Sequence, residues 1–193
     1  MKKLIYYKEG DHMDNRIKLN LKAKISETGK MMEKVKKIAS FLKEDEFIEY
    51  FFESEKENAS SELKLKKREY EIIVTYSSSI KKGPILETVG YSFFIDNPTQ
   101  FIDFLEKINF KISCMIHKKS RFYSYDDIEI EISSIEELGD FIELNVQGKK
   151  EFEEQNRKKL IELANKLGLR EKNIYSKFYF EIFKEKLSRE EIN

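Results

Sequence analysis

Strict alternation of apolar and polar residues predicts a β-strand at residues 16–25. In the segment RIKLNLKAKI every second residue from Ile17 to Ile25 is apolar, and lysine or asparagine occupies the positions between them. Successive side chains of a strand point to opposite faces, so this strand presents one apolar face and one ionisable face. The same alternation recurs in the segments LKLKKR, IEIEIS and IELNV, which begin at Leu63, Ile128 and Ile142.

Apolar positions spaced by three and four residues predict the helices. The first helix covers residues 28–42, and its apolar side consists of Met31, Met32, Val35, Ile38, Ala39 and Leu42. Asn97 and Pro98 are a suitable N-cap and first-turn residue for a second helix that reaches residue 108. A third helix spans residues 150–167 and stops at Gly168, and a short last helix spans residues 177–187.

The other segments predict short strands and therefore the fold class. Strands are expected at residues 47–53, 62–69, 70–76, 110–117, 119–125, 128–133 and 140–147, with one more ending near Ile95 and a loop at residues 77–84. Around eight strands with two inserted and two appended helices predict an α+β fold. The strands are expected to form an antiparallel barrel or a strongly curved antiparallel sheet.

The composition fits one globular domain with a heavily charged surface. Of the 193 residues, 40% are apolar and 37% are charged, which is enough for a single buried core. Lys and Arg together number 36, as do Asp and Glu, so the net charge is zero. This balance removes the whole-protein electrostatic argument for a nucleic-acid or membrane partner. We therefore expect neither partner, and the sequence carries no signal for an oligomeric state.

Cysteine use and the N-terminal segment indicate the compartment. The single cysteine, Cys114, excludes an internal disulfide and a cysteine-rich zinc site. The sequence contains neither a signal-peptide core nor an apolar run of about 18 residues, so we expect a cytoplasmic protein. Residues 1–14 lack periodicity and are predicted to be a flexible leader, with Met1 or Met13 as the start. Residues 15–193 are predicted to form one domain that includes the C-terminal helices.

The ionisable strand faces allow two interpretations. They are either the solvated outer side of a sheet whose other side packs on helices, or the polar lumen of a closed barrel. The second interpretation requires more strands than two helices can cover. Aromatic residues near the C-terminus fit core positions that plug one end of such a barrel: Phe178, Tyr179, Phe180 and Phe183.

The order of these segments resembles the CYTH or triphosphate tunnel superfamily. The similar segments are NRIKLNLKAKI, EYFFE, ELKLKKRE, DNPTQFIDFLEKINFKI, the stretch from IHKKSRFYSYDD to LGDFIEL, and NIYSKFYFEIF, which together cover about residues 15–187. That superfamily contains class IV adenylyl cyclases, thiamine triphosphatases and inorganic tripolyphosphatases. The resemblance implies an antiparallel eight-stranded tunnel with helices packed outside, and it favours the lumen interpretation.

The resemblance also implies roles for residues that point into the tunnel. Basic residues of the family bind a triphosphate, because phosphate oxygens pair with ammonium and guanidinium groups. The positions that match are Lys22, Lys64, Lys66 and Lys118. Acidic residues of the family hold Mg²⁺ or Mn²⁺, because these ions prefer carboxylate oxygens.

The acidic positions depart from the family pattern. Where the family has the N-terminal motif ExExK, this chain has Lys18, Asn20 and Lys22. Two other expected acids are replaced by Ser133 and Asn145, so Glu143 is the acid retained. Glu129 and Glu131 share the Ser133 face of their strand, and two interpretations of them stay open. They are either salt-bridge partners of the lumen lysines, which is the favoured interpretation, or substitute ligands for Mg²⁺ or Mn²⁺ together with Glu143.

Alternation along each strand indicates which side chains point into the tunnel, and counting their charges predicts a cationic tunnel. Seven bases face three acids, Glu129, Glu131 and Glu143; the bases are Lys18, Lys22, Lys24, Lys64, Lys66, Arg68 and Lys118. We therefore predict a degenerate family member that binds ATP, tripolyphosphate or thiamine triphosphate with little or no catalysis. One alternative is an active metal-dependent triphosphatase or class IV-type adenylyl cyclase that uses Glu129, Glu131 and Glu143. The other is a non-catalytic interaction or scaffold protein.

Overall fold

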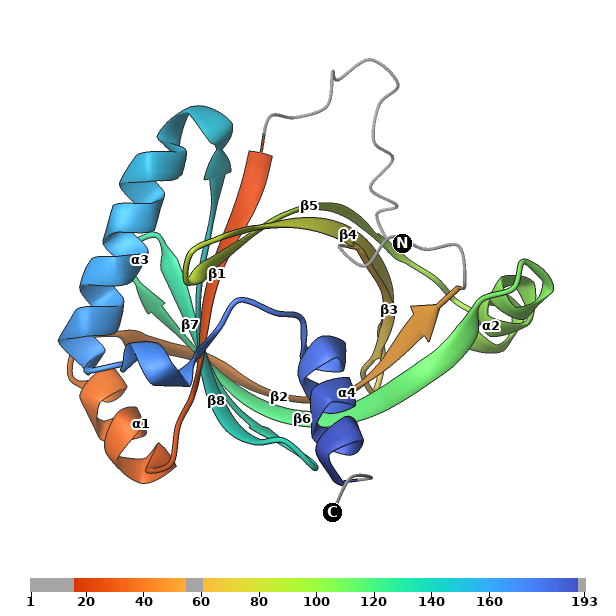
Figure 1. Cartoon of the computed structure of the whole chain (residues 1–193), viewed down its shortest axis with the longest axis horizontal. Helices are drawn as coiled ribbons and strands as arrows, with labels where there is room; N and C mark the ends of the chain where they lie inside the picture. Colours follow the sequence, from red (N-terminus) through yellow and green to blue (C-terminus); the bar gives the residue numbers. More distant parts are fainter. Residues whose placement is uncertain (1–15, 55–60, 191–193) are drawn as a thin grey trace.

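Eight antiparallel strands close into a ring in the computed structural model, which describes residues 16–54 and 61–190 (Figure 1). The order around the ring is β5-β4-β3-β2-β6-β7-β8-β1, and β1 also pairs with β5 to close it. β9 pairs with β1 beyond the end of the β5 pairing. The predicted α+β fold with antiparallel strands that close on themselves is confirmed as this ring. The leader expected at residues 1–14 lies outside the described residues.

The elements have the following bounds. The strands are β1 (Arg16–Lys24), β2 (Ser40–Glu53), β3 (Ser61–Lys67), β4 (Ile72–Lys82), β5 (Ile85–Phe94), β6 (Lys111–Tyr125), β7 (Ile128–Ile135), β8 (Gly139–Lys149) and β9 (Ile174–Tyr175). The α-helices in the described ranges are α1 (Thr28–Lys36), α2 (Pro98–Lys107), α3 (Glu153–Leu167) and α4 (Tyr179–Glu190). Short 3₁₀ turns at Lys150–Phe152 and Glu171–Asn173 precede α3 and β9.

Three sequence-based boundaries are wrong, and cross-strand pairing explains each. The helix predicted at residues 28–42 ends at Lys36, because the chain from Ser40 onward pairs with β6. The loop predicted at residues 77–84 is mostly strand: β4 continues to Lys82 and turns to β5 through Gly83 and Pro84. Gly83 has a positive φ of 63°, as the first residue of a two-residue hairpin turn requires. The two strands predicted at residues 110–125 are one strand, β6.

The predicted helix ends at α2 and α3 are confirmed. The Asn97 side chain accepts a hydrogen bond of 3.1 Å from the Gln100 amide, and Pro98 is the first residue of α2. Gly168 ends α3 with a φ of 76°, a left-handed conformation that favours glycine. None of the helices in the described part of the chain combines the length and apolar character needed to span a membrane.

Helices cover the apolar outer face of the ring on two sides. Val35 of α1 and Leu160 and Leu163 of α3 pack on the apolar residues of β1, β7 and β8, such as Leu21 and Leu144 (Figure 1). α2 covers a second outer core at the β3 and β4 side. Because side chains alternate, the ionisable residues of the same strands point into the ring. The sequence-based lumen interpretation therefore describes this fold.

The C-terminal segment packs against the inner face of the ring. The start of α4 is buried against two phenylalanines, Phe51 and Phe141, through Phe178, Tyr179 and Phe180. Strand alternation places Phe51 on the inner side of β2 with Glu49, and Phe141 on the inner side of β8 with Glu143. Figure 1 shows α4 at the β6 side of the ring. The plug expected from the C-terminal aromatic residues is thus present, and it leaves a polar region beside it.

Candidate functional site

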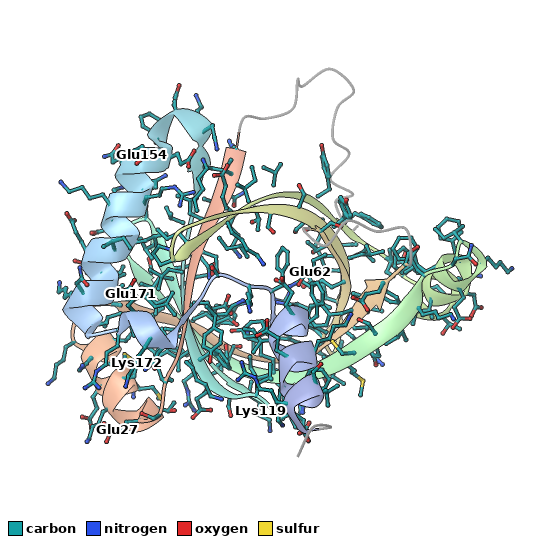
Figure 2. The ribbon with its side chains drawn as sticks, viewed as in Figure 1. Glu27, Glu62, Lys119, Glu154, Glu171 and Lys172 are labelled. Carbon is teal, nitrogen blue, oxygen red and sulfur yellow. The ribbon has the colours of Figure 1, made fainter. Side chains whose placement is uncertain are left out.

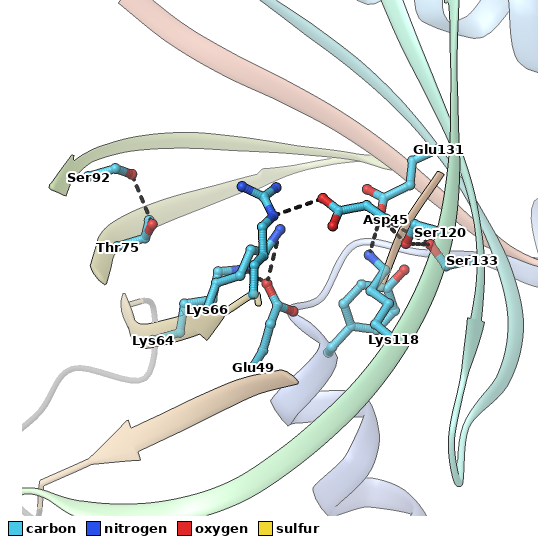
Figure 3. Close-up of polar contacts among 12 residues, drawn as sticks. Asp45, Glu49, Lys64, Lys66, Thr75, Ser92, Lys118, Ser120, Glu131 and Ser133 are labelled. Carbon is cyan, nitrogen blue, oxygen red and sulfur yellow. Dashed lines mark hydrogen bonds and ion pairs between the residues drawn. The ribbon is translucent and has the colours of Figure 1, made fainter. Parts of the chain in front are cut away.

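Ten charged side chains gather inside the ring in what we call the interior charged cluster. The five bases come from β1, from β3 with the residue after it, and from β6: Lys22, Lys64, Lys66, Arg68 and Lys118. The five acids come from β2, β3, β7 and β8: Asp45, Glu49, Glu62, Glu131 and Glu143. Figure 3 shows how several of these side chains converge from separate strands.

Lys118 joins two acids that face each other on neighbouring strands. Its Nζ atom lies 2.8 Å from a carboxylate oxygen of Glu131 and 2.8 Å from one of Glu143. Glu131 and Glu143 are paired in the β7–β8 register, so their side chains leave the sheet side by side. Burial opposes the charged form of Lys118, but the carboxylates of Glu131, Glu143 and Glu49 raise its pKa above the ordinary lysine value.

Both acids receive further hydrogen bonds. Ser120 and Ser133 donate their hydroxyls to Glu131 at 2.7 and 3.1 Å (Figure 3). Glu143 accepts from the Asn20 amide at 2.8 Å and from the Tyr179 hydroxyl at 2.7 Å. Burial alone would raise the pKa of Glu143, but the positive charges of Lys118 and Lys22 and these hydrogen bonds hold it well below the ordinary value. Glu143 is therefore an anion with fully engaged oxygens.

A second group of ion pairs lies at β2 and β3. Lys64 Nζ is 3.1 Å from Glu49 and 3.4 Å from Glu62, and Lys66 Nζ is 3.7 Å from Glu49. Burial would raise the pKa of Glu49, but the neighbouring lysines lower it to about 2. Burial lowers the pKa of Lys66 to about 8, against the pull of Glu49, and its ammonium rests 3.8 Å from the centre of the Phe47 ring.

Lys22 is held by neutral groups of the C-terminal segment. Its ammonium donates a 2.9 Å hydrogen bond to the carbonyl oxygen of Lys177 and lies 3.8 Å from the centre of the Tyr179 ring. Lys118 approaches the same ring, at 4.7 Å. Burial lowers the pKa of Lys22, and Glu143 opposes this shift. The start of α4 therefore positions two lysines of the cluster.

The structure brings together most, but not all, of the site residues predicted from the sequence. Lys22, Lys64, Lys66 and Lys118 lie in one cluster with Glu131 and Glu143. Glu129 is exposed and lies outside this cluster, because it occupies the end of β7. Lys18 and Lys24, which were expected inside, are likewise exposed on β1.

The predicted excess of positive charge is wrong. The interior charged cluster contains five bases and five acids and is therefore neutral. The acids missed in the sequence are Asp45, Glu49 and Glu62, and each forms an ion pair with a cluster base. Buried charges require partners, so pairing is what lets these bases occupy the interior.

The acids as arranged do not fit a Mg²⁺ or Mn²⁺ site. Within the described ranges, no three His, Cys, Asp or Glu residues are grouped so that they could hold a metal ion. The oxygens of Glu131 and Glu143 that would bind a cation are turned toward the ammonium of Lys118. The Asn20 amide donates to Glu143 and, at 2.8 Å, to the side-chain oxygen of Asn145. Two uncharged amides thus stand where the resemblance described above leads one to expect acids.

Comparison with known proteins gives a consistent set of similarities. The family model for the CYTH domain matches residues 21–179. A candidate adenylate cyclase of Methanocaldococcus jannaschii is 25% identical over 180 residues, which is 86% of this chain and 98% of that protein. A solved structure from Pyrococcus horikoshii has a TM-score of 0.77 at 22% identity and covers 85% of this chain and 98% of its own.

A more distant solved structure shares the fold. It is a candidate adenylyl cyclase from Hippeastrum, described as having a dominant triphosphatase activity. The TM-score is 0.65 at 13% identity, over 88% of this chain and 95% of that one. At this level of identity, the likeness concerns the fold.

Proposed function

The chain belongs to the CYTH domain family, and from this premise we propose that its ring interior binds a triphosphate- or polyphosphate-type anion with little or no turnover. The ligand class is that of ATP, tripolyphosphate and thiamine triphosphate. The observation that carries the proposal is the convergence of Lys22, Lys64, Lys66 and Lys118 from three different strands. The partner is thus a small molecule, and the cytoplasm is the compartment that the sequence favours.

The four lysines differ in what a phosphate must replace. Lys64, Lys66 and Lys118 are paired with carboxylates, so a bound phosphate takes over positions that Glu49, Glu131 and Glu143 occupy in the free protein. Lys22 donates to a backbone carbonyl and can turn to a phosphate oxygen without separating an ion pair. In this proposal Lys22 turns from the carbonyl to the phosphate, and the other three lysines bind as their ion pairs rearrange.

Low turnover follows from the state of the acids. Asn20 and Asn145 cannot supply anionic oxygens, and Glu143 is engaged by three donors. Stabilising the charge that develops during phosphoryl transfer is worth several kcal/mol, and about 1.4 kcal/mol corresponds to a tenfold change in rate. Without that stabilisation, we expect cleavage of a bound triphosphate to be much slower than its release.

Calorimetric titration with tripolyphosphate, without divalent metal, tests the binding. We expect a binding signal that weakens as salt rises, because charges form the contacts. Lys66→Ala removes a charged hydrogen-bond donor and should weaken binding by about 1.5–3 kcal/mol. Lys37→Ala is the matched control, because this exposed lysine follows α1 on the outer side. An identical response of the wild type and Lys66→Ala, including no response, would favour the scaffold interpretation.

An activity assay separates binding from catalysis. The wild type should release phosphate from tripolyphosphate or ATP at a rate close to the blank, with Mg²⁺ or Mn²⁺ present or absent. Metal-dependent turnover that disappears in Glu143→Gln would instead support an enzyme that uses Glu131 and Glu143, with Glu129, after rearrangement of the ion pairs described above.

A further inference from the structure

Glu62 is the most weakly paired acid of the interior charged cluster. Its side chain is 6% exposed, and its carboxylate meets Lys64 Nζ at 3.4 Å. The same ammonium is closer to Glu49, at 3.1 Å, and Glu49 has Lys66 as a further partner at 3.7 Å. Two buried carboxylates therefore compete for one ammonium, and the geometry favours Glu49.

The charged groups that face Glu62 come from three strands. Lys64 lies on the same strand, Glu49 on β2 and Lys22 on β1. Burial raises the pKa of Glu62, Lys64 lowers it, and the negative charge of Glu49 raises it again, so that the net pKa is above the ordinary glutamate value. Figure 2 places the Glu62 side chain at the β3 side of the ring.

A polyphosphate in the ring would remove the support that keeps Glu62 ionised. The ligand brings several negative charges and competes for the ammoniums of Lys64 and Lys22, which are the cations that favour the Glu62 carboxylate. Like charges in a buried site strongly favour protonation of the weakest acid. Glu49 and Glu143 are held as anions by additional donors, so Glu62 is the acid expected to take up a proton first.

We propose that Glu62 takes up one proton from solvent when a polyphosphate binds in the ring, so that binding at this site is coupled to protonation. The inference rests on the proposed function and adds its pH dependence. A group that gains a proton on binding makes affinity rise as pH falls, and affinity levels off once the free protein already carries that proton. Each pKa unit by which the ligand raises Glu62 contributes about a tenfold change in affinity.

The test is calorimetric titration of the full chain with tripolyphosphate in buffers of different ionisation enthalpy. The dependence of the apparent heat on buffer gives the number of protons taken up. The measurements are made at about pH 6–7, below the pKa of about 8 that burial gives Lys66, so that most Lys66 side chains are charged. Glu62→Gln keeps the shape of the side chain and removes its ionisation. Glu154→Gln is the matched control, since Glu154 is exposed on the outer helix α3 (Figure 2).

We expect the wild type and Glu154→Gln to take up about one proton more than Glu62→Gln, because the ligand's own protonation is common to all three proteins. Glu62→Gln should also bind more tightly than the wild type near neutral pH, by about tenfold for each pH unit above the pKa of Glu62 in the free protein. Equal proton uptake by the wild type and Glu62→Gln, with binding intact, would overturn this inference and leave the proposed function in place. Absence of binding by the wild type in every buffer would overturn the proposed function, and this inference with it.

Thermal unfolding establishes whether Glu62→Gln is native. Should it fail to fold, Glu62→Ala takes its place in the comparison, because alanine also lacks an ionisable group. Proton uptake by Glu62→Ala equal to that of the wild type, with binding intact, would contradict coupled protonation.

Discussion

Removal of the Lys118 ammonium should be among the most damaging single changes in the ring interior. Lys118→Met keeps most of the side-chain volume but leaves Glu131 and Glu143 as neighbouring buried anions without their shared cation. Breaking a buried ion pair by removing one partner costs about 3–5 kcal/mol. Because both acids keep hydrogen bonds from serine, asparagine and tyrosine side chains, we expect the lower end, about 3 kcal/mol.

The pH dependence gives this prediction a second signature. In the wild type the pKa of Glu143 is held well below its ordinary value, so its stabilisation is present above the unfolded-state pKa and is lost as pH falls through the folded-state pKa. In Lys118→Met the main cause of that lowering is gone, and the pKa of Glu143 rises in the folded state. The gap in stability between the two proteins should therefore be widest near neutral pH and should shrink at about pH 4.

Urea unfolding followed by circular dichroism measures both signatures. Lys119→Met is the control, because Lys119 is the next residue of β6, points outward and is well exposed beside Glu46. An exposed pair of this kind contributes roughly 0–1 kcal/mol. Adding Glu143→Gln to Lys118→Met should recover part of the loss, since one buried charge disappears. If Lys118→Met costs no more than Lys119→Met, the ion-pair reasoning for the whole cluster is refuted.

Three further predictions test other parts of the ring. Tyr179→Phe removes the hydroxyl that donates to Glu143 and should lower the free energy of unfolding, measured by chemical denaturation, by about 1.5–3 kcal/mol. An unchanged free energy of unfolding would show that this hydrogen bond does not stabilise the fold. Lys66→Arg should keep tripolyphosphate binding constant above pH 8, where the wild type weakens as Lys66 loses its proton; parallel pH profiles from calorimetry would contradict this. Leu144→Ala opens a cavity between β8 and the helices outside the ring, and thermal and urea unfolding should show a loss of about 2–5 kcal/mol.

The fold could be predicted where local pattern and tertiary structure agree. In β1 the alternation around Leu19 and Leu21 is strict, because one face packs on α3 and the other faces the ring interior. The prediction failed at β2, where apolar residues from Met31 to Leu42 happen to follow a helical spacing. There the chain leaves the helix after Lys36, and the backbone groups from Ser40 onward are satisfied by pairing with β6 instead.

The same boundary explains why part of the site was missed. Asp45 shares the inward face of β2 with Phe47, Glu49 and Phe51, but it precedes the strand predicted at residues 47–53 and was therefore missed. Glu49 lies within the predicted strand, so its inward direction could have been read from its spacing to Phe47 and Phe51. Glu62 shares the parity of Lys64, so its inward direction could have been read directly from the sequence. The hydrogen bond from Tyr179 to Glu143 could not be predicted, because it depends on how α4 packs and not on any strand pattern.

The neutral interior changes what binding an anion requires. A tunnel with an excess of positive charge could accept a polyphosphate simply by replacing water, whereas here the ligand must replace carboxylates that already satisfy the lysines. Each carboxylate set free in a buried site needs a new cation or a proton, because an unpaired buried charge is costly. Affinity is therefore governed less by the number of lysines than by how readily their acids are neutralised. The weakly paired Glu62 is the acid of the cluster that is most readily neutralised by a proton.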